Sequence, residues 1–323
     1  STLFVANQTR TSSNALTPRG GGIRFNRMKT QPELFRGYLL SLIAVTGFGF
    51  TFIAVTLGSE SFDPITMSIG RVVPAGILAV IALKLMKQPL LPPREAYPLI
   101  LGSSIGIIIG FPLLSTLALQ SIPAADAGVI GAVTPMVTGI VAVFIGHKRP
   151  KPMFWAAAAL GAISAMSLAY FKGGTDFGGG TYWGYLAMAF AVLLASMGHI
   201  SGSTLVAKYS SFTVLSWAVI ISIPIQLPIA VVNWSINPIT EWPTWTAILG
   251  FLYVSWFSLS IGNFMLNQGL HIIGLVKGAQ LQLLQPIVTM VLSILILQQP
   301  VSPITWLAAF GILTSIAWSQ RYR

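Results

Sequence analysis

Polar side chains recur at regular intervals in the apolar segment between residues 253 and 267. They follow steps of three and four residues: Tyr253, Trp256, Ser260, Asn263 and Asn267. On a regular α-helix this spacing places the side chains on one face, over about 21 Å at 1.5 Å per residue. Hydrogen bonds between packed helices are one explanation. A stripe of this length exceeds what local packing needs, so we predict that its first four members line a cavity that binds a small polar solute.

A second polar stripe follows within residues 277–297. Its members are Gly278, Gln282, Gln285, Thr289 and Ser293. We predict that Gln282, Gln285 and Thr289 line the same cavity. Pro286, and Pro135 in an earlier segment, each remove a backbone donor within a helix and free a carbonyl for a substrate, water or a neighbour. A hinge or kink at these prolines is the functional interpretation, and helix packing by itself is the other.

Two ionisable side chains, Arg71 and His199, lie inside apolar segments. Such groups are costly in a membrane and usually face a polar interior. His199 could hydrogen-bond a substrate or carry a proton, or it could bond a neighbouring helix. Arg71 could receive a carboxylate. Alternatively, its side chain could extend toward Glu60 or Asp63, or hold helix ends together.

Several kinds of chemistry are excluded by missing residues. The chain has no Cys, no H-E-x-x-H motif, no G-x-S-x-G motif with a placed His, and no Asp or Glu in the middle of an apolar segment. We therefore predict no catalytic residue, no metal site and no cofactor, and we expect neither a carboxylate proton relay nor an acidic anchor for a cationic drug. A lining of aromatic, amide and imidazole groups favours neutral or zwitterionic solutes such as amino acids, including aromatic ones.

The segments that carry these residues are typical of an all-α integral membrane protein. Hydrophobic residues make up 54% of the chain, charged residues only 8%, and the mean hydropathy is +0.78. A helix needs roughly 20 residues to cross the hydrocarbon core. On this basis we predict ten spans, at 37–57, 64–85, 97–119, 125–146, 154–171, 184–207, 212–234, 244–267, 277–297 and 304–320. Gly106–Gly110 and Gly198–Gly202 have the G-x-x-x-G spacing of closely packed membrane helices.

The basic residues favour one orientation. On one side of the predicted membrane lie Lys29, Arg36, Lys84, Lys87, Arg94, Lys148, Arg149, Lys151, Lys208, Arg321 and Arg323. Lys172 is the only basic residue in the connections on the other side, which predicts that both termini are cytoplasmic in a cell membrane, most simply a bacterial inner membrane. The net charge of +11 forms no continuous basic face, so the expected partners are lipid and a small-molecule substrate rather than nucleic acid. Residues 1–35 are expected to be a polar basic tail, disordered or in part not native.

The sequence also repeats itself. A shift of 151 residues aligns the fourth and fifth predicted spans with the ninth and tenth and matches Pro135 with Pro286, Thr138 with Thr289 and Trp155 with Trp306. Each half then has five helices. Because five is an odd number, the second half enters the membrane from the opposite side and has the opposite orientation. We therefore predict two inverted five-helix repeats, 36–171 and 184–323, around a central cavity, an arrangement typical of secondary transporters.

These features resemble the EamA family of the drug/metabolite transporter superfamily. The resemblance covers Arg36 to Arg323 and rests on the runs 124–144 and 277–297 with their prolines and on Arg71. Within the family, the chain resembles the YddG group of bacterial amino-acid exporters. The resemblance implies export through a cavity lined by spans one to four and six to nine, with five and ten peripheral. Drug, sugar or nucleoside carriers of the same superfamily and an intramembrane enzyme are the alternatives.

Overall fold

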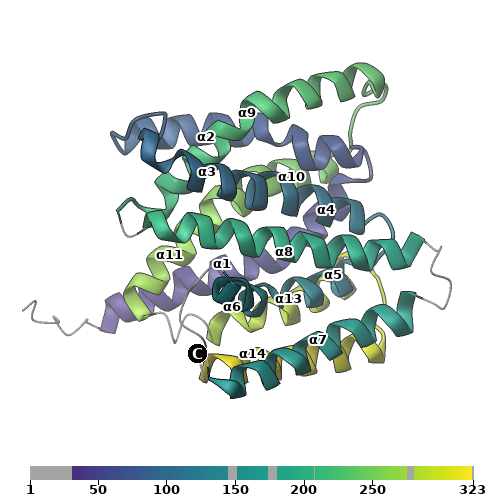
Figure 1. Cartoon of the computed structure of the whole chain (residues 1–323). Coiled ribbons are helices and arrows are strands. Elements are labelled where there is room, and N and C mark those ends of the chain that lie inside the picture. Colours follow the sequence, from purple (N-terminus) through teal and green to yellow (C-terminus); the bar gives the residue numbers. More distant parts are fainter. Residues whose placement is uncertain (1–30, 145–150, 174–179, 207, 275–279, 322–323) are drawn as a thin grey trace, which may run out of the picture.

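The computed structural model describes residues 31–144, 151–173, 180–206, 208–274 and 280–321, so most of the predicted N-terminal tail lies outside it. Within these ranges the chain is a bundle of helices (Figure 1). Its elements are α1 (Gln31–Gly58), η1 (Thr66–Gly70), α2 (Val72–Leu85), η2 (Arg94–Ala96), α3 (Tyr97–Ser103), η3 (Ser104–Gly110), α4 (Phe111–Ala118), α5 (Ala124–Gly131), α6 (Thr134–Phe144), α7 (Pro152–Gly173), α8 (Gly180–Val206), α9 (Ser211–Ile236), α10 (Trp245–Tyr253), η4 (Val254–Ile261), α11 (Gly262–Ile273), α13 (Leu284–Leu297) and α14 (Pro303–Arg321).

Nine continuous helical segments of the described chain are long and apolar enough to cross a membrane. They are 31–58, 66–85, 94–118, 124–144, 152–172, 181–206, 211–236, 245–273 and 280–297, and a tenth, shorter apolar helix covers 303–319. These positions agree with the predicted spans, although the first begins earlier and the eighth ends later than predicted. Side-chain caps begin two of the helices: the Ser210 hydroxyl accepts from Thr213 N at 3.1 Å, and the Thr244 hydroxyl accepts from Ala247 N at 3.2 Å.

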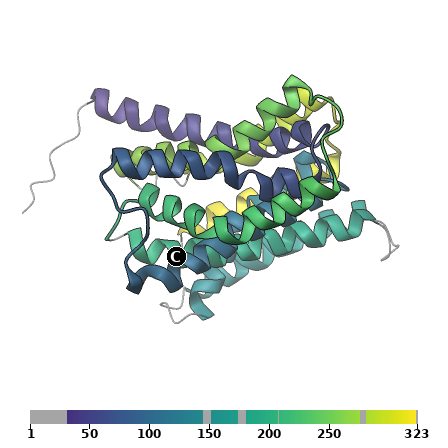
Figure 2. The same cartoon turned by 90° about the horizontal axis from the view of Figure 1, so that it is seen from above.

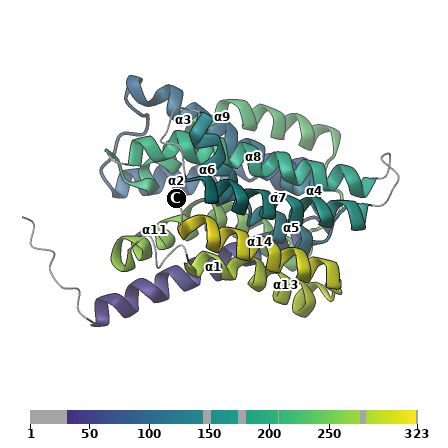
Figure 3. The same ribbon diagram turned by 60° about the horizontal axis from the view of Figure 1, so that its bottom comes forward.

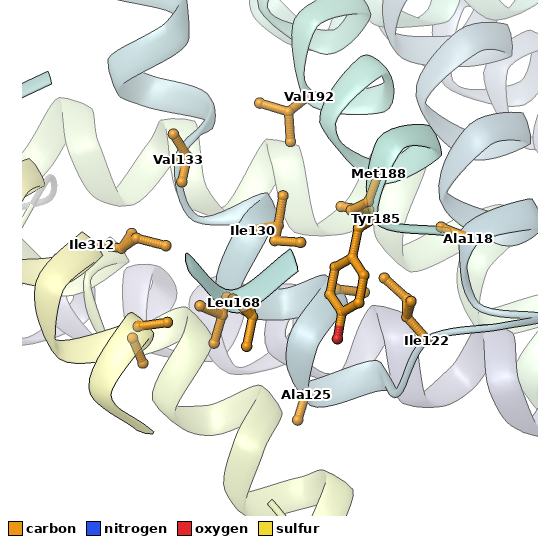
Figure 4. Packing of buried hydrophobic residues seen from close by; sticks show 14 of the residues in the cluster. Ala118, Ile122, Ala125, Ile130, Val133, Leu168, Tyr185, Met188, Val192 and Ile312 are labelled. Carbon is orange, nitrogen blue, oxygen red and sulfur yellow. The ribbon is translucent and has the colours of Figure 1, made fainter. Parts of the chain in front are cut away.

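The helices run lengthwise, so that their connections gather at the two ends of the bundle (Figure 2). Helix α8 lies centrally and packs against α3, α4 and α6, while α1 packs against α10, α11 and α13. Helices α7 and α14, the fifth and tenth spans, pair along one edge (Figures 1 and 3). An apolar cluster joins this pair to α5 and α8, with the Tyr185 ring among Leu168, Ile122 and Met188 (Figure 4).

Several spans are not regular α-helices. The fourth span is interrupted by a turn at Ala132 and Val133, and the ninth by a turn at Leu283. The shift of 151 residues carries position 132 to position 283, so the two interruptions are equivalent. Pro135 and Pro286 then fall in the first turn of α6 and α13, where a missing amide donor costs little. The Gly131 carbonyl, which Pro135 cannot bond, accepts the Thr134 hydroxyl at 2.6 Å, so this freed carbonyl has an internal partner.

The connection between α1 and η1 is held by a carboxylate. Asp63 accepts hydrogen bonds from the backbone of Ile65 and Thr66, the Thr66 hydroxyl and the Asn233 amide, at 2.6–3.1 Å. Burial by itself raises the pKa of Asp63. The hydrogen bonds lower it by a larger amount, so the pKa of Asp63 lies below its ordinary value of 3.8. The carboxylate of Asp63 therefore stabilises the folded state fully at pH values above the pKa that Asp63 has in the unfolded chain. This contribution is lost as the pH falls through the pKa that Asp63 has in the folded protein.

We expect Asp63→Asn to lower the free energy of unfolding by about 1 kcal/mol near neutral pH. Its deficit relative to the parent protein should shrink below about pH 4, where the parent carboxylate is protonated as well. Unfolding in detergent across this range measures the difference. Glu60→Gln, which changes an exposed acid in the same connection, is the control and should stay within about 0.5 kcal/mol of the parent. A deficit that does not change with pH would contradict the assignment.

Candidate functional site

A cavity of about 410 Å³ lies inside the bundle. Side chains from the first, second, third, fourth, sixth, eighth and ninth spans surround it. The lining comprises Phe48, Thr51, Phe52, Val55, Arg71, Ile107, Phe111, Pro112, Ser115, Gly131, Ala132, Thr134, Pro135, Thr138, Ala195, His199, Ser258, Leu259, Asn263, Leu266, Gln282 and Gln285. Its volume suits a small organic solute. Helices α7 and α14 contribute no described lining residue, in agreement with the peripheral position that the family resemblance implies. Helix α9, the seventh span, contributes no described lining residue either, although the resemblance implies that it lines the cavity.

Many of the predicted site residues meet at this cavity. Arg71, at the junction of η1 and α2, and His199, on α8, both line it. Asn263 reaches it from α11, while Gln282 and Gln285 reach it from the ninth span. The structure thus brings together side chains that are far apart in the sequence. Pro135 also lies on the lining, whereas Pro286 does not appear among the lining residues.

Other predicted residues lie elsewhere. The Tyr253 hydroxyl donates to Gly47 O at 2.8 Å, and its ring borders a separate apolar groove beside α1. The Trp256 indole donates to Pro74 O at 3.0 Å, and the Thr289 hydroxyl donates to Gly49 O at 2.9 Å. These side chains, and the buried Ser260, join neighbouring helices or lie between them rather than lining the cavity.

For Tyr253, Trp256 and Ser260 the reason is the π-helix η4 in the middle of the eighth span. A π-helix bonds each amide to the fifth residue before it, so its turns are wider than those of an α-helix. Steps of three and four residues across η4 therefore do not keep to one face. Ser258 and Leu259 reach the cavity here, and Asn263 reaches it from the α-helix that follows. The predicted continuous stripe assumed regular α-helical geometry, and this assumption is wrong.

The phenylalanines of the lining were not predicted, because the predicted aromatic members were Tyr253 and Trp256. Phe48 and Phe52 on α1 and Phe111 on α4 border the cavity, and Phe52 and Phe111 meet edge to face with ring centroids 6.5 Å apart. Phenylalanines that face lipid have the same local sequence context, so hydropathy does not distinguish them. Close by, the Thr51 and Ser258 hydroxyls lie 2.8 Å apart and join α1 to η4.

Arg71 is the strongest electrostatic feature of the lining. Its side chain is 5% exposed, and its Nε has no hydrogen-bond partner within the described part of the chain. The alternative of an ion pair with Asp63 is not seen, because the carboxylate of Asp63 is bonded to Ile65, Thr66 and Asn233. The guanidinium therefore borders the cavity with unused hydrogen-bonding capacity.

A second polar cluster, also not predicted, lies away from the cavity. Lys172 Nζ lies 2.7 Å from Asp126 Oδ2, and the Tyr185 hydroxyl donates to the same oxygen at 2.5 Å. The Thr305 hydroxyl donates to Asp126 Oδ1 at 2.8 Å. This cluster joins the ends of α5, α7, α8 and α14. Asp126 and Lys172 lie 46 residues apart in the chain, and the sequence contains no signal that they pair.

Similar proteins carry the same architecture. The chain is 30% identical over 290 residues to "Uncharacterized transporter YdeK" of Bacillus subtilis (strain 168), covering 88% of this chain and 97% of that protein. It is 24% identical over 290 residues to "Uncharacterized inner membrane transporter YedA" of Escherichia coli (strain K12), covering 87% and 88%. A crystal structure of a protein with 17% identity superposes with a TM-score of 0.60 over 88% of this chain and 98% of that one, which supports the fold.

The EamA-like transporter family matches this chain twice, at residues 35–170 and 182–320. The two matches cover nearly all of the described helices. The family and the relatives named above are transporters and not enzymes. The chain is therefore a multi-pass membrane transporter that belongs to the EamA-like transporter family.

Proposed function

We propose that this protein exports small zwitterionic metabolites, amino acids including aromatic ones, through the cavity described above. The observation that supports this proposal is the composition of the lining. It combines a guanidinium, an imidazole and three carboxamides with phenylalanine rings. Such a set can bind a carboxylate, hydrogen-bond polar groups and accommodate an aromatic or aliphatic side group. A nucleotide-sugar would need several cations for its phosphates, and Arg71 is the only Arg or Lys among the described lining residues.

The proposed mechanism is alternating access between two inverted five-helix repeats, 36–171 and 184–323. Three observations support it: the two family matches, the equivalent interruptions at positions 132 and 283, and a lining drawn from both halves. Nearly equivalent halves of opposite orientation can rock about a shared central site. We propose a bacterial inner membrane location, which the name of the relative "Uncharacterized inner membrane transporter YedA" supports. We propose that both termini are cytoplasmic because of the distribution of basic residues.

Transport by purified protein in sealed liposomes tests this proposal. With a panel of radiolabelled amino acids, we expect saturable exchange of neutral members such as threonine, methionine and phenylalanine. Protein-free liposomes are the control. Failure to exchange any member of a broad panel would contradict the amino-acid assignment, and a steady conductance would instead indicate a channel.

We expect His199→Ala to lower transport about three- to tenfold at matched expression, because the imidazole borders the cavity and loses its hydrogen bond to the substrate. Ser203→Ala is the matched control, since Ser203 lies on the same helix but does not line the cavity and bonds the carbonyl of Ile200. Initial rates over a range of substrate concentrations measure both variants. Near-normal kinetics in His199→Ala would show that the imidazole does not touch substrate.

A further inference from the structure

The charge balance of the cavity narrows the class of substrate. Among the described lining residues, Arg71 and His199 are the titratable ones, and none is an Asp or Glu. Arg71 is almost fully buried and its Nε has no described partner. An isolated buried charge is unfavourable, and a bound carboxylate offsets this by supplying charge-assisted hydrogen bonds. The cavity is therefore built to receive an anion.

Among its described residues, the same lining has no charged group that would bind a cation. An amino acid carries an ammonium as well as a carboxylate, and in a low-dielectric site an ammonium is best stabilised by an ionised carboxylate. Here the described acceptors are uncharged amide, hydroxyl and carbonyl oxygens. The Asn263 amide nitrogen donates to Ser258 O at 3.0 Å, so what this side chain can offer an ammonium is its uncharged Oδ1. Contact with the ammonium thus adds little to binding, whereas contact with the carboxylate adds a paired charge.

The remaining wall is apolar. Phe48, Phe52 and Phe111 lie on it together with Ile107 and Leu266. Ring edges and faces of this kind accept an aromatic or branched aliphatic group. Together, the three observations describe a substrate with one anionic group and one apolar group, for which a cationic group is not required.

We propose, resting on the proposed function, that the cavity recognises an apolar monocarboxylate and does not require an α-ammonium. Aryl- and alkyl-carboxylic acids and 2-oxo acids would then share the site with the corresponding amino acids. An amine that lacks the carboxylate would be excluded.

The test uses matched ligands that differ in one charged group. The full-length protein in liposomes exchanges radiolabelled phenylalanine in the presence of 3-phenylpropanoate, which lacks the ammonium, or 2-phenylethylamine, which lacks the carboxylate. We expect 3-phenylpropanoate to compete about as well as phenylalanine, and 2-phenylethylamine to need about tenfold more or worse. Competition by the amine that matches or exceeds competition by the acid would overturn the proposal.

Variants assign the effect to Arg71. Arg71→Gln is expected to weaken binding of radiolabelled 3-phenylpropanoate to the purified protein about tenfold or more, with partial recovery in Arg71→Lys. Lys84→Gln is the matched control, because it removes a positive charge from the same span at an exposed position outside the cavity. Equal binding by Arg71→Gln and Lys84→Gln would contradict the assignment.

Direct binding also separates this proposal from the proposed function. Binding of 3-phenylpropanoate without exchange of any amino acid would contradict the amino-acid function and support the monocarboxylate site. Exchange of phenylalanine without binding of 3-phenylpropanoate would overturn the monocarboxylate site and support the amino-acid function.

Discussion

Gly106→Ala is expected to destabilise the bundle more than other glycine-to-alanine substitutions in the third and sixth spans. Gly106 on η3 faces Gly198 on α8, and an added Cβ would overlap the Leu194 carbonyl oxygen and lie 2.7 Å from Gly198 Cα. These neighbours are backbone atoms, so no side-chain rotation relieves the overlap and the two helices must separate. We expect a loss of about 3 kcal/mol, the upper range for overpacked cores.

The thermal stability of the purified protein in detergent measures this loss. Gly76→Ala is the matched control: the added Cβ would lie 3.0 Å from Ile223 Cδ1, the end of a side chain that can rotate away. We expect this control to lie within about 1 kcal/mol of the parent protein. Equal stability of the two variants would show that the close approach of η3 and α8 contributes little.

Part of this packing follows from the sequence. The spans follow from hydropathy and length, because the membrane requires long apolar helices with internally bonded backbones. The G-x-x-x-G spacing predicts close helix packing at Gly106 and at Gly198, but it does not predict that these two glycines face each other. Arg71 and His199 are also predicted at the cavity because a polar group in an apolar span must face a polar interior.

The positions of the other site residues depend on the irregular helix and on tertiary packing, and the local sequence predicts neither. The π-helix η4 changes the facing of Tyr253 and Trp256, and nothing in the residue pattern of that span predicts its presence. The phenylalanines of the cavity wall resemble lipid-facing ones in sequence. Pairs such as Asp126 and Lys172, or Thr51 and Ser258, form only through tertiary packing. The polar stripe of the second half was therefore overestimated, and the individual residues of α1 that line the cavity were not identified.

Asp126→Asn is expected to lower the free energy of unfolding by about 3 kcal/mol, the range for breaking a buried ion pair. The asparagine keeps the shape of the side chain, removes its charge and replaces one acceptor oxygen with an amide donor. Lys172 then loses its counter-charge, while the hydroxyls of Tyr185 and Thr305 lose a charged acceptor. Glu241→Gln, which removes an exposed negative charge, is the control and should stay within about 0.5 kcal/mol of the parent.

A double-variant cycle separates the pair from the general effect of each substitution. Lys172→Met leaves the Asp126 side chain, which is 1% exposed, without its cation, so this single variant should be at least as unstable as Asp126→Asn. Combining the two removes both charges, and we expect the double variant to be more stable than the sum of the single losses predicts. Strict additivity would mean that the ion pair itself contributes nothing. Gly131 on α5 and His199 on α8 line the cavity, so the cluster at Asp126 joins two of the helices that form the cavity wall to the peripheral pair α7 and α14.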